Sequence, residues 1–325
     1  MSHELTTNAL TGQVEFAYRA ADGEPWHGLG QPMADAASID EWRAAAGMNW
    51  TIGRSRVRYG DETRFRIIED QHVLYRSDTK DHLGIVSKSY QIVQPSEVLE
   101  FFRSVVKAGG LEMSAAGTIY GGRRFWATAK IGSASPVSIR DRVDGFLLLT
   151  TSCDGSSATE ARLTSTRVVC KNTLAIARAD GKPALRVSHR TAFDPEAVKA
   201  QMGLNTAAWD AFRANVTRLS EVAMPLDQAE EVIAGILATA PGQLGRDKAR
   251  EQRGFDKIIG LFRGEGMGAQ LDGTAGTAWG LLNAVTEYAD HHVRARSDEH
   301  RFVSAQWGQG ADLKQRAWDD LIALA

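Results

Sequence analysis

The first half of the chain is patterned for strands and short helices. Four segments between residues 50 and 95 are predicted to be strands: WTIGRSRVRYG, RFRIIED, HVLYRSD and LGIVSKSYQIVQP. In the first of them the alternation runs through Ile52, Val57 and Tyr59. Upstream, Ser38 and Glu41 have the spacing of a capping box and predict a short helix that ends near Gly47.

The apolar residues of SEVLEFFRSVVKAGG, residues 96–110, recur with the period of an α-helix. Ser96 is a suitable N-cap residue, and the glycine pair ends the pattern. The apolar residues that fall on one face of this helix are Leu99, Phe102, Val105 and Val106. The sequence therefore predicts an amphipathic helix.

The central part predicts a β-meander followed by a helix. Residues 111–132 read as two strands joined at Gly121-Gly122, and residues 143–155 read as a third strand. The next segment predicts a strand up to about Arg167 and then a helix through Ala179. The choice between strand and helix for STRVVC stays open at this stage.

The last third of the chain is patterned for helices. Residues 195–262 are rich in alanine with long amphipathic stretches, a glycine-rich break follows, and two more helices are predicted, the first capped by Thr277. The first twenty-five residues predict little regular structure. The expected fold class is α+β: an antiparallel β-meander packed on helices in the N-terminal and central part, and a mostly helical C-terminal part. The expected division is 1–25, 26–192 and 193–325.

The distribution of charge along the chain is uneven and adds a functional clue to the predicted fold. The chain has 325 residues and a net charge of −2, but residues 121–190 hold twelve Lys and Arg against five Asp and Glu. That segment therefore carries +7 and the remainder −9. A basic segment in an acidic chain favours an anion-binding surface, and the alternative is a solvated sheet face whose arginine stems cover apolar neighbours.

The predicted hairpin at residues 120–130 mixes cations with aromatic rings. Alternation places Arg124, Trp126 and Thr128 on one face, and Arg123, Phe125 and Ala127 on the other. Arginine and an aromatic ring on one face can hold single-stranded nucleic acid by phosphate pairing and base stacking. In the alternative interpretation, one face is core and Trp126 is buried.

The cysteines and histidines give weaker evidence for a functional site than the basic segment does. Cys153 and Cys170 are sixteen residues apart with no second cysteine beside either, which gives neither a zinc pair nor a disulfide framework. A nucleophilic cysteine would need a base such as His189, and buried inert thiols are the competing interpretation. The histidines of DHHVRARSDEH, residues 290–300, lack the i, i+4 spacing of a helical zinc motif. No metal, cofactor or catalytic residue is assigned.

The expected compartment is the cytoplasm. No apolar run is long enough to span a bilayer, so no membrane partner is expected. The N-terminal segment also lacks the basic and apolar regions of a signal peptide.

Four segments, taken in order, carry a family resemblance: PWHGLG, AGTIYGGRRFWATAKI, TSCDGSSATEARLTSTRVVCKNTLAIA and GTAWGLLNAVTEYADHH. Together they resemble the phage/plasmid-like proteins that carry domain of unknown function 932, over most of the chain from Pro25. The resemblance implies a phage or plasmid setting and implies no catalytic residues. By fold-level analogy, the basic meander is similar to that of phage single-strand annealing proteins, which form oligomers.

These observations give one leading hypothesis and two competing ones. The leading hypothesis is a DNA-metabolism protein that binds single-stranded nucleic acid, acts in annealing or recombination, and forms homo-oligomers. Its expected contacts are Arg123, Arg124, Trp126, Lys130, Arg162, Arg167 and Lys171. An enzyme that processes nucleotides or phosphates would instead bring together Asp154, Ser156, Cys170 and His189. The third hypothesis is a non-enzymatic phage accessory protein that acts on a host factor through an exposed apolar patch.

Overall fold

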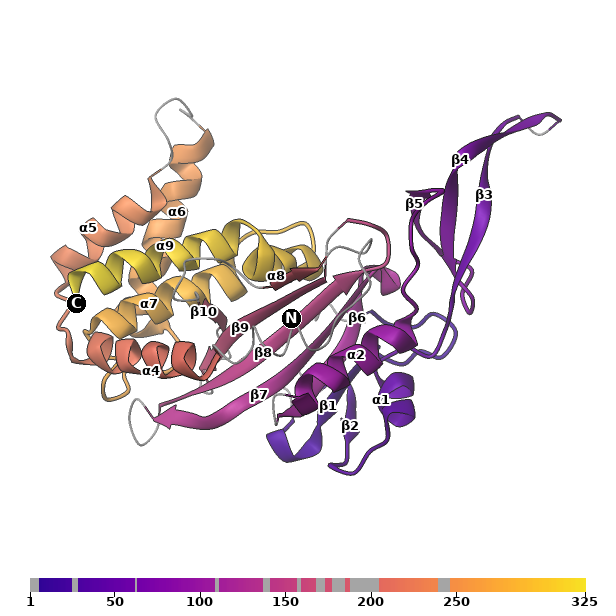
Figure 1. Ribbon diagram of the computed structural model, residues 1–325. Coiled ribbons are helices and arrows are strands. Elements are labelled where there is room, and N and C mark those ends of the chain that lie inside the picture. The colour runs from indigo at the N-terminus through magenta and orange to yellow at the C-terminus, as the bar shows by residue number, and fades with distance from the viewer. Residues whose placement is uncertain are drawn as a thin grey trace. The chain divides into compact units, whose positions relative to one another are not determined.

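The chain folds into an α+β protein, as the sequence predicted (Figure 1). The computed structural model describes residues 6–24, 29–61, 63–108, 111–136, 141–156, 159–167, 173–176, 185–187, 205–238 and 246–325. The chain divides into two compact units that interleave in sequence. The first comprises residues 1–131, 147–162 and 182–204; the second comprises 132–146, 163–181 and 205–325. The predicted domain boundary near residue 192 stays a prediction.

The strands form two sheets. The larger one has the order β10-β9-β8-β7-β6-β1-β2, with β11 paired to β9, and the smaller one has the order β3-β4-β5. The strands of the larger sheet are β1 (Phe16–Arg19), β2 (Gln31–Met33), β6 (Glu112–Ile119), β7 (Arg124–Pro136), β8 (Arg142–Ser152), β9 (Thr159–Arg167), β10 (Thr173–Ile176) and β11 (Leu185–Val187). Those of the smaller sheet are β3 (Ile52–Gly60), β4 (Phe65–Arg76) and β5 (His82–Ser87). The β6–β7–β8–β9 meander is therefore confirmed.

Local signals predicted the two α-helices that the structure describes in the first unit, although the second begins at Pro95, before its predicted N-cap Ser96. Helix α1 (Ile39–Ala45) begins at the predicted capping box, in which Ser38 and Glu41 each accept from the other's backbone N–H. Helix α2 (Pro95–Ala108) buries its predicted apolar face and packs beside β6. The Gly121-Gly122 connection forms the short helical turn η2 (Tyr120–Gly122) between β6 and β7.

The second unit gathers helices around α7. Its helical elements are α4 (Asn205–Glu221), α5 (Leu226–Leu237), α6 (Arg246–Gly260), the π-helical turn η3 (Leu261–Glu265), α7 (Ala278–Glu287), the π-helical turn η4 (Tyr288–His292), α8 (Asp298–Trp307) and α9 (Gln309–Leu324). Every residue of α7 is buried, and its predicted cap is confirmed because the Thr277 side chain accepts from the N–H of Gly280. None of the helices in the described ranges is long and apolar enough to cross a membrane.

Two sequence expectations were wrong. Residues 16–19 were expected to lack regular structure, but they form β1 between β2 and β6, and Phe16 is buried there. Residues 173–176 were expected to be helical, but they form β10, which pairs antiparallel with β9. In both cases pairing with a strand distant in sequence decided the local structure, which a periodicity argument does not capture.

Candidate nucleic-acid interface

Of the predicted contact residues in the meander, Trp126 does not lie on an exposed surface. Trp126 is only 9% exposed and stacks on Phe16 with 5.5 Å between ring centroids, so its ring belongs to the core and offers no face to a base. Arg162 lies in a close ion pair with Glu160, with 2.9 Å between Nη2 and Oε2. Lys130 stands directly opposite Glu112 in the β6–β7 register.

The remaining predicted cations are split between the hairpin turn and the end of β9. Arg123 and Arg124 are half-buried beside η2, and the Arg124 guanidinium lies 5.6 Å from the centre of the Tyr120 ring. Arg167 ends β9, and nothing is described of its side chain. Lys171 lies outside the described residues. The strand that was predicted to end at about Arg167 is confirmed, because β9 ends at this residue.

The residues of the enzyme hypothesis that are described do not form a reactive site. Burial, and secondarily the charge of Asp154, raises the pKa of the Cys153 thiol to about 12. The thiol is therefore protonated at neutral pH and donates to the carbonyl oxygen of Gly122 at 3.3 Å. Asp154 accepts from the N–H of Ser156 at 2.9 Å, which is a turn contact. Cys170 and His189 lie outside the described residues.

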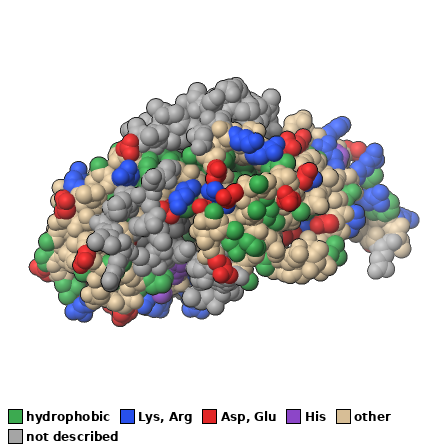
Figure 2. Space-filling view, turned by 90° about the horizontal axis from the view of Figure 1, so that it is seen from below, with side chains coloured by type: hydrophobic (Ala, Val, Ile, Leu, Met, Phe, Trp, Pro, Cys, Tyr) green, Lys and Arg blue, Asp and Glu red, His purple; other side chains and the backbone are tan. Residues whose placement is uncertain are grey.

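One exposed basic feature of the first unit is a β-ribbon made of β3, β4 and their turn. We call residues 52–76 the arm. Figure 1 shows β3 and β4 extending away from α1 and α2 of the same unit, and Figure 2 shows Lys and Arg side chains gathered over the arm, at the right of the view. The arm arginines that are exposed are Arg54, Arg56, Arg58, Arg64 and Arg66.

The guanidinium groups of most of these arginines have no ion-pair or hydrogen-bond partner within the described part of the chain. Among the residues that the structure describes, no carboxylate pairs with any of the five. Arg54 donates to the carbonyl oxygen of Tyr90 at 2.8 Å, and the Arg58 guanidinium lies 4.8 Å from the centre of the Phe65 ring. Tyr59 and Phe65 are themselves 55% and 60% exposed. Surfaces that bind nucleic acid commonly combine guanidinium groups with exposed aromatic rings, as the arm does.

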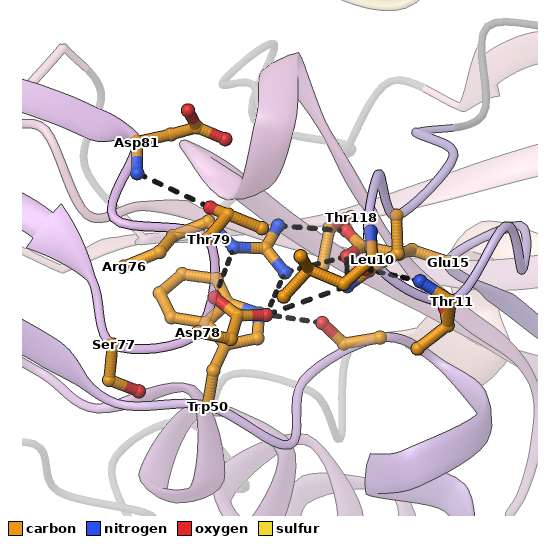
Figure 3. Close-up of polar contacts among 12 residues, drawn as sticks. Leu10, Thr11, Glu15, Trp50, Arg76, Ser77, Asp78, Thr79, Asp81 and Thr118 are labelled. Atoms are coloured by element: carbon orange, nitrogen blue, oxygen red, sulfur yellow. Dashed lines mark hydrogen bonds and ion pairs between the residues drawn. The ribbon is translucent and has the colours of Figure 1, made fainter.

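A buried ion cluster holds the root of the arm. Arg76, the last residue of β4, is 2% exposed and lies between the carboxylates of Glu15 and Asp78 (Figure 3). Its Nη2 is 2.7 Å from Glu15 Oε1 and 2.8 Å from Asp78 Oδ2, and its Nε is 3.0 Å from Asp78 Oδ1. The Trp50 ring lies under the guanidinium, 4.3 Å from its carbon to the ring centroid. We call Glu15, Arg76 and Asp78 the Arg76 cluster.

The cluster ties the arm to the larger sheet of the same unit. Thr118 of β6 donates its hydroxyl to Glu15, and Nη1 of Arg76 donates to the carbonyl oxygen of Gly121 at 3.2 Å. Gly122 fits here because it has φ +92° and no side chain: a Cβ would lie 2.6 Å from the Trp50 ring. Nη1 also donates to Glu15 Oε2 at 3.2 Å. All five N–H groups of Arg76 thus have acceptors, so the root of the arm is fixed in one geometry.

A pocket of about 330 Å³ opens beside the Arg76 cluster. Its polar wall includes Asn8, Glu15 and Asp78. These side chains hydrogen-bond one another: the Asn8 amide donates to Glu15 at 3.1 Å and to Asp78 at 3.5 Å. Their polar atoms are already engaged in fixing the arm, and we assign the pocket no ligand.

The Arg76 cluster should make the stability of the fold depend on pH. Burial alone would raise the pKa of Asp78, but the hydrogen bonds and charge of Arg76 outweigh it and hold that pKa below its ordinary value. A depressed folded-state pKa stabilises the fold above the unfolded pKa, near 3.9, and the stabilisation is lost as the pH falls through the folded pKa. The melting temperature of Asp78→Asn should therefore fall less than that of the wild type between about pH 5 and pH 3. Parallel curves for the two proteins would contradict this assignment.

Comparison with known proteins identifies the family. Residues 82–307 match the family model described as Domain of unknown function (DUF932). The chain belongs to this family. No curated protein and no solved structure matches the chain. The DUF932 match begins at the first residue of β5, so β3, β4 and Arg76 lie outside the matched range.

The arm is the functional candidate that the sequence analysis missed, and the DUF932 match does not include any of it. Its signal was present: Arg54, Arg56 and Arg58 alternate in GRSRVRYG and so would share one face of a regular strand. The apolar residues of the same strand indicated a half-buried strand instead, with one face covered by the core. Only the structure shows that the outer arm is exposed on both faces, which turns the arginine row into a surface. Within the described residues, no group of three or more His, Cys, Asp or Glu side chains is arranged to hold a metal ion.

Proposed function

We propose that this protein is a non-enzymatic nucleic-acid-binding protein and that the arm is its main contact surface. The observation that carries the proposal is the set of exposed arm arginines that pair with no carboxylate among the described residues. Free guanidinium groups form strong, geometrically specific hydrogen bonds with phosphate oxygens. Tyr59 and Phe65 add exposed ring surface at the outer end of the arm, where bases or sugars could pack.

Local charge supports the proposal although the whole chain is slightly acidic. The arm, residues 52–76, holds six arginines against four acidic residues, a local charge of +2, whereas the chain has a net charge of −2. A basic projection on an acidic protein directs an anionic polymer to that projection. The acidic remainder would disfavour nonspecific coating of the protein by nucleic acid.

Shortening the arm tests the proposal. Val57 and Ile68 are direct partners in the β3–β4 register, so residues 58–67 can be replaced by Asn-Gly, which favours a two-residue hairpin turn. The shortened protein should keep its far-UV circular dichroism spectrum and melting temperature. It should lose at least about 100-fold in affinity for a fluorescent 30-nucleotide probe, since three guanidinium groups and two rings are removed. Unchanged affinity with an intact fold would overturn the proposal.

Single-strand annealing, within the DNA-metabolism role that the sequence suggested, is a second candidate function. The observation that favours it is the Arg124 guanidinium over the Tyr120 ring, next to Arg123 at the half-buried turn η2. This surface is smaller than the arm, and Trp126 adds nothing to it. We therefore propose annealing only as an activity of a protein whose main binding surface is the arm.

A further inference from the structure

The outer part of the arm is a ribbon of two strands only. β5 pairs with β4 from Gln71 to Tyr75, and beyond that point β3 and β4 pair only with each other, from Val57 with Ile68 to Gly60 with Phe65. Four residue pairs at about 3.3 Å each span roughly 13 Å. The major groove of B-form DNA is about 8.5 Å deep and admits a two-stranded ribbon. The outer arm is thus narrow enough to enter that groove and long enough to reach its floor.

Its cations lie on both faces of the ribbon. Arg58 is opposite Ile67 in the regular outer part of the ribbon and lies on one face, whereas Arg56 precedes the register shift between Arg56 and Val57. Arg66 is opposite Tyr59 and therefore lies on the other face. A ribbon in a groove has a phosphate backbone on each side, so cations are useful on both faces. A single strand lying along the ribbon would be contacted mainly from one face.

The aromatic rings are also divided between the faces. Tyr59 and Phe65 belong to neighbouring register pairs, Tyr59–Arg66 and Gly60–Phe65, and so project from opposite faces. Proteins that bind single strands by stacking present their rings along one groove, so that successive bases can stack. The exposed rings of the arm therefore do not form one stacking platform.

At the tip of the ribbon, the carboxylate of Asp61 is engaged in hydrogen bonds within the turn. The Asp61 carboxylate accepts from the N–H and hydroxyl of Thr63 and from the N–H of Arg64, all at 2.8 to 2.9 Å. These hydrogen bonds hold the pKa of Asp61 below its ordinary value. Gly60 has φ +145°, and a Cβ there would lie 2.1 Å from the carbonyl oxygen of Arg64, so glycine permits the tight closure. An ordered turn with an internally bonded carboxylate can approach a phosphate backbone.

We propose that the ligand of the arm is B-form duplex DNA, and that the outer ribbon inserts into its major groove with Arg58 and Arg66 facing opposite phosphate backbones. The inference rests on the proposed function and adds the substrate class to it. Duplex RNA is disfavoured because its major groove is deep and narrow. The Arg76 cluster, by fixing the root, sets the direction in which the ribbon projects from the first unit.

Probe choice tests the substrate class. Wild-type protein is titrated with a 30-base-pair DNA duplex, one of its single strands and the corresponding RNA duplex, all at the same salt concentration. The duplex DNA should bind at least about 10-fold more tightly than either of the other two probes. Equal or tighter binding of the single strand or of the RNA duplex would overturn the inference and leave the proposed function standing. Binding of none of the three would overturn both.

Single substitutions test the two-face geometry. Arg58→Ala and Arg66→Ala should each weaken duplex binding by about 5-fold, whereas Arg58→Lys and Arg66→Lys, which keep the charge, should retain most of the affinity. Arg316→Ala, an exposed arginine of the second unit, is the matched control and should change affinity less than about 2-fold. An effect of Arg58→Ala with none of Arg66→Ala would show a one-face contact and overturn insertion.

Discussion

Replacing Arg76 by methionine is expected to lower the free energy of unfolding by about 3 to 5 kcal/mol. The guanidinium is 2% exposed, and its removal leaves Glu15, equally buried, without its cation. Thr118 and Asn8 still donate to Glu15, but two neutral hydrogen bonds do not replace a paired charge. Asp78 loses its partner as well. Methionine keeps much of the side-chain volume, so the expected loss comes from unpaired charge more than from a cavity.

Urea unfolding followed by tryptophan fluorescence measures this effect, because Trp50 lies directly on the Arg76 guanidinium. Since the chain has two units, the comparison should use the transition that reports the first unit. The control is Arg43→Met, which breaks an exposed pair with Asp40 and should cost less than about 1 kcal/mol. Equal midpoints for Arg76→Met and Arg43→Met would contradict the role assigned to the Arg76 cluster.

The second large effect is expected on binding. The triple variant Arg56→Ala, Arg58→Ala and Arg66→Ala should bind nucleic acid roughly 100-fold more weakly than the wild type, at about 1 kcal/mol for each lost phosphate contact. All three side chains are exposed and none pairs with a carboxylate in the described part of the chain, so stability should change little. The expected result is therefore a loss of affinity without a loss of fold.

A matched triple variant separates the location of charge from its amount. Arg294→Ala, Arg296→Ala and Arg316→Ala removes the same number of positive charges from exposed positions of the second unit. It should weaken binding less than about 3-fold, because only its long-range contribution to the field is lost. Similar losses for the two triple variants would mean that net charge, and not the arm, governs binding. Fluorescence anisotropy at fixed salt gives both affinities.

Local sequence signals predicted much of the fold. The capping box of Ser38 and Glu41, the cap at Thr277 and the Gly121-Gly122 hairpin were all predicted correctly because each depends on residues a few positions apart. Strand β10 was mistaken for a helix because its conformation follows from pairing with β9. Strand β1 was missed for the same reason. Its four residues carry too little pattern, and its neighbour β6 comes about a hundred residues later.

The candidate site was less accessible to sequence reasoning. The contact between Glu15 and Arg76 joins residues 61 positions apart, and neither residue stands out in its own segment. The arm arginines have a clear alternation, yet the same alternation fits a sheet covered on one side. Conversely, Trp126 lies among arginines in the sequence, as a base-stacking residue would, but its side chain belongs to the core. Exposure decides between these interpretations, and exposure depends on what the rest of the chain covers.

The salt dependence of binding tests the central claim most directly. For the tighter-binding probe, the logarithm of the association constant is plotted against the logarithm of salt concentration for the wild type and for the Arg56, Arg58 and Arg66 triple variant. If these three arginines contact phosphates, the slope should become shallower by about 2.7 for a duplex or about 2.1 for a single strand. Equal slopes for the two proteins would contradict the claim that the arm binds nucleic acid.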